Sequence, residues 1–143
     1  MTDRMTVAGF GFRAQASLAS LRDALAQALA HRNVSESPAG SITLIATAQD
    51  KADAACLQAL AASLNLPVCA VAPEDLASMT TLTDSAPVRA RRGTGSVAEA
   101  AALAAAVRVG GAGATLLHPR TVSSDRLATC AIASFTPIPG NRS

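Results

Sequence analysis

Apolar residues recur along the chain in two alternating patterns, short and mostly apolar runs and helical stripes. The short runs Met5–Phe10, Ile42–Ala46 and Val68–Ala72 predict three strands, the first two of them buried. Leucines at three- and four-residue spacing between these runs predict two helices with one apolar face each, over Gln15–Arg32 and after Asp50. This alternation of strand and helix indicates a largely parallel sheet covered on both faces, and hence an α/β fold.

The two leucine stripes define the faces that these helices should bury. The first stripe consists of Leu18, Leu21, Leu25 and Leu29. The second stripe consists of Leu57, Leu60 and Leu64. Asp50 is the expected N-cap of the second helix, and the sequence Asn65-Leu-Pro67 should end it.

The second half of the chain predicts one short helix, one long helix and two further strands. Pro73–Ala77 has the proline and acidic residues of a helix start, and Val97–Val107 is an alanine-rich helix. Ala114–Leu117 and Leu127–Ala133 should pair as a C-terminal hairpin. The loop between them would place Arg120, Ser123 and Ser124 at its tip.

Length and composition indicate a single compact domain. The chain has 143 residues, half of them apolar, so we expect one domain over residues 1–133 and a disordered tail over 134–143. Trp and Tyr are absent and the net charge is only +2, which argues against binding of nucleic acid. No apolar run is long enough to cross a membrane.

The cysteines and histidines predict neither disulfides nor a metal site. Cys56, Cys69 and Cys130 are odd in number and lack C-x-x-C spacing, and the sequence begins without a secretory signal. We therefore expect reduced, buried thiols and a cytoplasmic protein. His31 and His118 lie far apart without cysteine or carboxylate at ligand spacing, so neither a metal nor another cofactor is expected.

The turn that precedes the alanine-rich helix is the strongest candidate for a binding site. Gly93 and Gly95 permit close approach of a ligand, and Ser96 with Glu99 has the spacing of a capping box. A helix N-terminus attracts anions, and the segment Arg89–Arg92 adds cations just upstream. The alternative interpretation is that Ser96 and Glu99 only complete the helix end. The lysine and spacing of a P-loop are absent.

Two further loops follow predicted parallel strands, where ligands bind in open α/β sheets. Gly9 and Gly11 permit a tight turn that leads to Arg13, although a lone G-x-G is equally consistent with a plain strand-to-helix turn. Lys51, the single lysine of the chain, lies at a helix start, where its charge opposes the helix dipole. A bound anion would account for that placement, and simple exposure to solvent is the alternative.

The ordered set of motifs resembles the CobE family, which matches the C-terminal domain of CbiG in cobalamin biosynthesis. The resemblance is carried by Val7–Arg13, Ile45–Asp53, Leu64–Val68, Gly93–Ala101 and Thr129–Ala133. It implies a three-layer α/β sandwich, which agrees with the mostly parallel sheet and C-terminal hairpin predicted above.

The resemblance implies a role in building the corrin ring, and we expect binding or carriage of a precorrin-type tetrapyrrole. The carboxylates of such a ligand would need cations and N–H donors around an apolar floor. Full-length CbiG proteins open a lactone on a cobalt-precorrin, but they carry an N-terminal domain that this sequence does not contain. The alternatives are a precorrin hydrolase or isomerase, with Glu99 or His118 as proton carrier, and a scaffold for biosynthetic methyltransferases.

Candidate ligand-binding residues lie in four stretches of the chain, most of them in the stretches that carry the resemblance, and no catalytic residue can be named. The candidates are Gly9, Gly11, Arg13, Lys51, Gly93, Thr94, Gly95, Ser96, Glu99, Arg120 and Ser124. Other cobalamin-biosynthesis enzymes are expected as partners. The alanine-rich helix could also pack against a second subunit, so we expect a homodimer.

Overall fold

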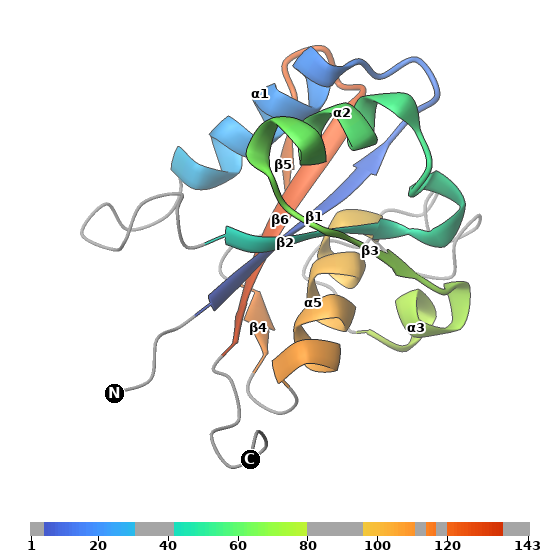
Figure 1. Ribbon diagram of the computed structural model, residues 1–143, viewed down its shortest axis with the longest axis vertical. Helices are drawn as coiled ribbons and strands as arrows, with labels where there is room; N and C mark the ends of the chain where they lie inside the picture. The colour runs from blue at the N-terminus through green and yellow to red at the C-terminus, as the bar shows by residue number, and fades with distance from the viewer. Residues whose placement is uncertain (1–4, 31–41, 80–95, 111–113, 117–119, 136–143) are drawn as a thin grey trace.

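The computed structural model describes residues 5–30, 42–79, 96–110, 114–116 and 120–135. These residues form a six-stranded sheet with helices on both faces (Figure 1). The strand order is β3-β2-β1-β6-β4, and β5 also pairs with β6. The predicted α/β sandwich is therefore confirmed.

The sheet has a parallel part and an antiparallel part that meet at β1. The strands are β1 (Met5–Phe12), β2 (Ile42–Ala48), β3 (Val68–Val71), β4 (Thr115–Leu116), β5 (Thr121–Val122) and β6 (Ala128–Phe135). β1, β2 and β3 run parallel, whereas β6 is antiparallel to β1, β4 and β5. The predicted pairing of the last strands is confirmed, but β5 lies in a segment that we predicted as loop.

The helices form two layers on opposite faces of the sheet. They are α1 (Leu18–Ala30), the 3-10 turn η2 (Gln49–Lys51), α2 (Ala55–Leu64), α3 (Pro73–Ser78) and α5 (Val97–Gly110). Figure 1 shows α1 and α2 on one face of the sheet, with α3 and α5 on the other.

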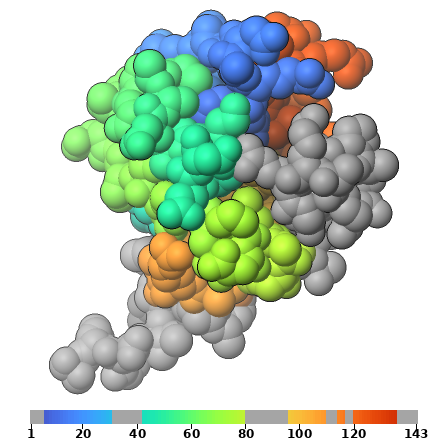
Figure 2. All heavy atoms as spheres, turned by 90° about the vertical axis from the view of Figure 1, so that its right-hand side faces the viewer, coloured from blue at the N-terminus to red at the C-terminus, as the bar shows by residue number. Residues whose placement is uncertain are grey.

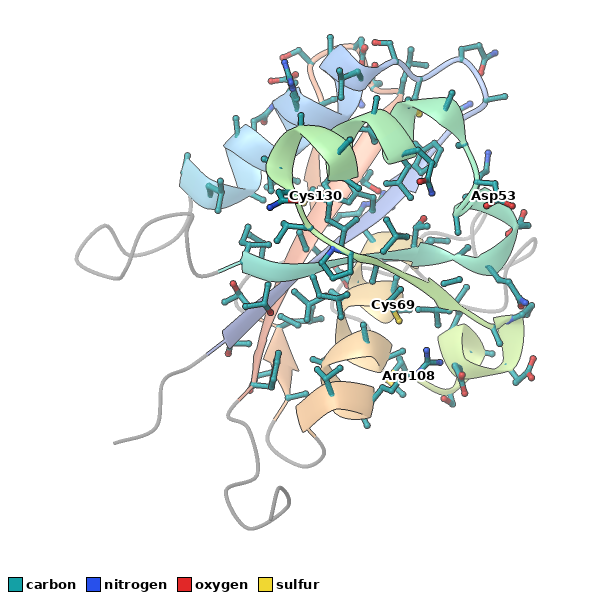
Figure 3. All side chains as sticks on the ribbon, viewed as in Figure 1. Asp53, Cys69, Arg108 and Cys130 are labelled. Atoms are coloured by element: carbon teal, nitrogen blue, oxygen red, sulfur yellow. The ribbon has the colours of Figure 1, made fainter. Side chains whose placement is uncertain are left out.

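Alternating side chains of β1 are buried in two separate apolar cores, one on each face of the sheet. Ala8 and Phe10 are buried with the leucines of α1 and α2. Val7 is buried in the second core, with the alanines of α5. Cys130 of β6 lies in the first core, between the sheet and the helices α1 and α2 (Figure 3). Both faces of the central strands are therefore covered, as expected for parallel strands.

The helix starts differ from those predicted. α1 begins at Leu18, because the Ser17 hydroxyl accepts the amide N–H of Ser20 while the Ser20 hydroxyl accepts that of Ser17. Asp50 is not the N-cap of α2. It belongs to η2, and α2 starts after Ala54 without a side-chain cap.

Two further expectations are corrected by burial. Leu57 and Leu60 are buried as predicted, but Leu64 is 40% exposed at the end of α2. Ser134 and Phe135, which we assigned to the tail, belong to β6 and are buried. Residues 136–143 lie outside the described part of the chain.

In the described part of the chain, none of the helices has the length and apolar character needed to cross a membrane.

Candidate functional site

The carboxyl ends of β1, β2 and β3 meet at one edge of the sheet because these strands are parallel. Figure 2 looks onto this edge: the blue segment after β1, the teal segment after β2 and the yellow-green α3 after β3 share one face of the molecule. We call this face the carboxyl edge. It carries the candidate residues Arg13 and Lys51.

Threonine hydroxyls from both neighbouring strands hold the end of β1 in place. Thr47 of β2 donates to the carbonyl of Phe10 at 2.8 Å, and Thr129 of β6 donates to the carbonyl of Gly11 at 3.1 Å. The amide of Arg13 then donates to the carbonyl of Leu127 at 2.9 Å. The backbone that presents Arg13 is therefore anchored at three successive points.

Lys51 lies against the end of β1 through an aromatic contact. Its Nζ atom is 5.2 Å from the centroid of the Phe12 ring, within the range of a cation–π interaction. Among the described residues, no carboxylate forms an ion pair with Lys51, Arg13 or Arg120. The sequence prediction missed Phe12, because nothing in the local pattern connects it with a lysine in another loop.

The N-terminus of α5 packs against the same end of β1, on the opposite face of the sheet from Phe12. A Cβ atom on Gly11 would lie 3.3 Å from the Cβ atom of Val97 and 3.5 Å from the amide nitrogen of Ala98. The Ser96 hydroxyl accepts the amide N–H of Glu99 at 3.3 Å, which confirms Ser96 as the helix cap. The first turn of α5 therefore points its partial positive charge toward the carboxyl edge.

Glu99 does more than complete the helix end. Its side chain is fully buried, and its carboxylate accepts the amide N–H of Arg120 at 2.7 Å. This bond ties the first turn of α5 to the start of β5. The burial and the bond fit a structural role for Glu99 better than proton transfer to a ligand in solvent.

The two glycines of β1 serve close packing of α5 on the sheet. A Cβ atom on Gly9 would lie 2.2 Å from the carbonyl oxygen of Ala98 and 2.6 Å from the amide nitrogen of Ala102. Such distances leave no space for a side chain, so the helix backbone rests directly on the strand. The α5 face of Gly9 is thus occupied by the protein itself, and its role as a ligand contact stays a prediction.

Arg120 and Ser124 do not share the tip of a hairpin loop, contrary to our expectation. Arg120 precedes β5 and lies beside Glu99, whereas Ser124 lies in the turn between β5 and β6. The turn contains Ser123–Leu127, and its Arg126 has a φ angle of 62°. The pairing of β5 with β6 separates the two residues, because it shortens the predicted loop.

The remaining candidates Gly93, Thr94 and Gly95, and the upstream segment Arg89–Arg92, lie outside the described residues. So does His118.

A polar clasp joins the β5–β6 turn to α1. Asp125 accepts hydrogen bonds from the hydroxyls of Ser123 and Ser20, the latter at 2.6 Å, and Asp23 of α1 accepts the amide N–H of Ser124. The Ser123 hydroxyl lowers the pKa of Asp125 below its ordinary value, and the Ser124 amide does the same for Asp23. The Ser124 amide is thus used to hold the turn.

The clasp predicts loss of stability in acid. Because both folded-state pKa values lie below the unfolded value, the stabilisation is complete above the ordinary aspartate pKa of 3.8 and disappears as the pH falls through the lowered values. We expect the urea concentration at the unfolding midpoint to decrease when the pH is lowered beneath about 4. In the Asp125→Asn variant the urea midpoint should decrease less steeply with falling pH. A pH dependence equal to that of the unsubstituted protein would contradict this account of the turn.

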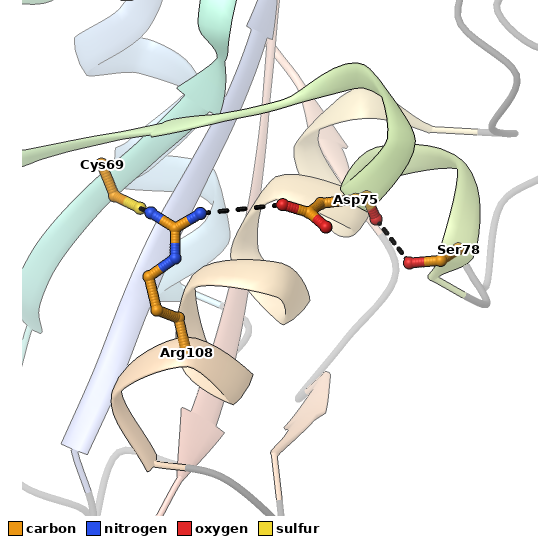
Figure 4. A network of polar contacts seen from close by, with 4 residues as sticks. All are labelled: Cys69, Asp75, Ser78 and Arg108. Carbon is orange, nitrogen blue, oxygen red and sulfur yellow. Dashed lines mark hydrogen bonds and ion pairs between the residues drawn. The ribbon is translucent and has the colours of Figure 1, made fainter.

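Arg108 of α5 joins β3 to α3. Its guanidinium donates to Sγ of Cys69 at 3.3 Å and lies 3.7 Å from the carboxylate of Asp75, which belongs to α3 (Figure 4). Both charged side chains are about half exposed, so this pair contributes little to stability. The guanidinium of Arg108 is therefore bound to other residues of the same chain.

Cysteine chemistry and metal binding find no support in the described residues. All three cysteines are free, and burial raises the pKa of the Cys130 thiol. Cys56 and Cys69 are only partly buried, which corrects the expectation of three buried thiols. Within the described ranges, no three His, Cys, Asp or Glu side chains gather as a metal site.

Comparison with known proteins identifies the family. Residues 6–133 match the model of the family described as cobalamin synthesis G C-terminus. The chain belongs to this family. A search of curated proteins gives no match.

Solved structures of two cobalamin biosynthesis proteins have the same fold. The crystal structure of CobE, a protein from the cobalamin (vitamin B12) biosynthetic pathway, is 33% identical with a TM-score of 0.81, and the match covers 94% of each chain. The cobalamin biosynthesis protein chiG from Agrobacterium tumefaciens is 35% identical with a TM-score of 0.60, over 90% of this chain and 97% of that one.

A larger protein carries the same fold as one of its parts. A cobalamin biosynthesis protein G homologue from Sulfolobus solfataricus is 20% identical with a TM-score of 0.64. The match covers 92% of this chain but only 37% of that one. The resemblance to CobE and to the CbiG C-terminal domain, stated from sequence motifs, is therefore confirmed.

Proposed function

We propose that this cobalamin biosynthesis protein binds a precorrin-type tetrapyrrole through the carboxylates on the rim of the macrocycle. The observation that carries the proposal is the presence of cations without carboxylate partners around the end of β1. Among the described residues, neither Lys51 nor Arg13 forms an ion pair, although both follow strands that end at the carboxyl edge. Family membership supplies the pathway in which such a ligand occurs.

The chemistry of the carboxyl edge fits a ligand with several carboxylates. Arg13 can offer a planar fork of N–H donors to one carboxylate, and the Lys51 ammonium can pair with another. The N-terminus of α5 adds a partial positive charge from the other face of the sheet. Because these groups come from three separate segments, a ligand with spaced acids would engage more of them than a small anion.

The proposal predicts that cations of the carboxyl edge, and not cations elsewhere, control tetrapyrrole affinity. Uroporphyrin III, a tetrapyrrole with acetate and propionate side chains, should bind saturably in a visible-absorbance titration. Lys51→Ala and Arg13→Ala should each weaken binding by about fivefold, in proportion to one lost ion pair. Arg22→Ala removes an exposed cation from α1 and should leave the affinity unchanged.

The same titration separates the alternatives. Saturable binding that neither substitution weakens would place the ligand elsewhere on the molecule. Absence of binding, together with capture of biosynthetic methyltransferases, would favour the scaffold role. Homodimer formation stays a prediction, and the alanines of α5 do not support it: Ala98, Ala102 and Ala105 are buried within their own subunit.

A further inference from the structure

Phe12 lies where the carboxyl edge meets the apolar core. It is the last residue of β1, it pairs with Ala128 of β6, and its ring packs against the core that α1 and α2 cover. Its backbone is adjacent to the anchored carbonyl of Gly11. The ring is therefore held on a rigid strand, and part of it remains at the surface.

Lys51 depends on that ring for its placement. Lysine has a flexible four-carbon stem, and fixing it in one arrangement costs conformational entropy whenever a ligand binds. In the described part of the chain, no carboxylate forms an ion pair with Lys51, and its Nζ atom lies 5.2 Å from the centroid of the Phe12 ring. A cation over an aromatic face remains able to bind an anion from its outer side.

We propose that Phe12 is a positioning residue that holds the Lys51 ammonium at the carboxyl edge for a ligand carboxylate. This inference rests on the proposed function, since it assigns the placement of one of the binding cations. Phe12 lowers the entropy that Lys51 loses on binding, which is preorganisation of the site. The Phe12 ring contacts Lys51 on the face of the sheet that α1 and α2 cover. The N-terminus of α5 lies on the opposite face.

The contact itself can be measured without any ligand, because Lys51 is the single lysine of the chain. Reductive methylation with ¹³C-formaldehyde labels Lys51 and the N-terminal amine, and methylation preserves the lysine charge. The Lys51 resonance is assigned by its absence from the Lys51→Ala variant. The Lys51 methyl resonance should be shifted upfield by the ring current of Phe12. In Phe12→Leu this shift should disappear, and in Phe12→Tyr it should persist. Identical spectra for all three proteins would overturn the inference.

A double-mutant cycle with uroporphyrin III tests the consequence for binding. Phe12→Leu should weaken binding by about two- to fivefold, the range expected from a surface cation–π contact, and Phe12→Tyr should restore it. In the Lys51→Ala background, Phe12→Leu should have no further effect. Circular dichroism establishes that each variant is folded.

The outcomes separate the inference from the function on which it rests. An equal loss of affinity from Phe12→Leu with and without Lys51 would mean that Phe12 acts independently of the lysine, which overturns its positioning role alone. Failure of the unsubstituted protein to bind uroporphyrin III would overturn the proposed function, and the role of Phe12 in binding with it.

Discussion

Gly9→Ala should lower the free energy of unfolding by about 3 kcal/mol, at the upper end of the cost of overpacking a core. The added methyl would lie 2.2 Å from the carbonyl oxygen of Ala98 and 2.6 Å from the amide nitrogen of Ala102. Both atoms belong to the backbone of α5, so a side-chain rotation cannot relieve the clash and the helix must move. Urea unfolding followed by circular dichroism measures the loss.

Gly11→Ala is the matched control on the same strand. Its added methyl would meet the Thr129 hydroxyl at 3.0 Å, and that hydroxyl can shift by a few tenths of an ångström. We expect a loss of about 1 kcal/mol, partly offset by the lower conformational freedom of alanine in the unfolded chain. Equal stability of Gly9→Ala and the unsubstituted protein would show that α5 does not rest on β1 as described.

Glu99→Ala should lower the free energy of unfolding by about 2–3 kcal/mol. The substitution removes the acceptor of the Arg120 amide, leaving a donor without its partner, and it opens a cavity where a fully buried side chain stood. The effect should be local as well as global. Hydrogen exchange at the Arg120 amide should become faster relative to amides in the centre of β6.

Glu99→Gln distinguishes the structural role from acid–base chemistry. Glutamine keeps an oxygen that can accept the Arg120 amide, so we expect a loss of about 1 kcal/mol. Tetrapyrrole binding should be retained in this variant. If Glu99→Gln were as unstable as Glu99→Ala, the Arg120 bond would not be the reason that Glu99 is buried.

Local patterns predicted most of the regular structure. Short, mostly apolar runs identified β1, β2 and β3. In β1 and β2 such runs arise because helices cover both faces of these central parallel strands. The leucine spacing of α1 correctly indicated Leu21 and Leu25 as buried. Ser96 was recognised as a cap because this interaction is local: its hydroxyl accepts the N–H of Glu99, which is three positions further along the chain.

Two of the errors concern the ends of α2. Asp50 has the chemistry of an N-cap, but η2 occupies that position and α2 begins at Ala55. Leu64 completes the spacing of the stripe, yet it is the last residue of α2 and is 40% exposed.

The site was predictable only in part, because its contacts join residues that are far apart in the chain. Arg13 and Lys51 follow strand ends, and the rule for parallel sheets indicated their common edge. The contact of Lys51 with Phe12, and the bond from Arg120 to Glu99, join residues that no spacing rule relates. Gly9 was interpreted as a turn residue, since the helix that requires it lies some ninety positions further along the chain.

The pairing of β1 with β6 also limits how far this protein can fold while it is being synthesised. Gly11 and Thr129 are neighbours in the sheet although 118 positions separate them in the chain. On the ribosome, β1 emerges early and must wait with one hydrogen-bonding side open until β6 has been synthesised. Closure of that long loop is entropically costly, so folding should be slow, and a nascent chain stalled before β6 would be vulnerable to aggregation through its open strand.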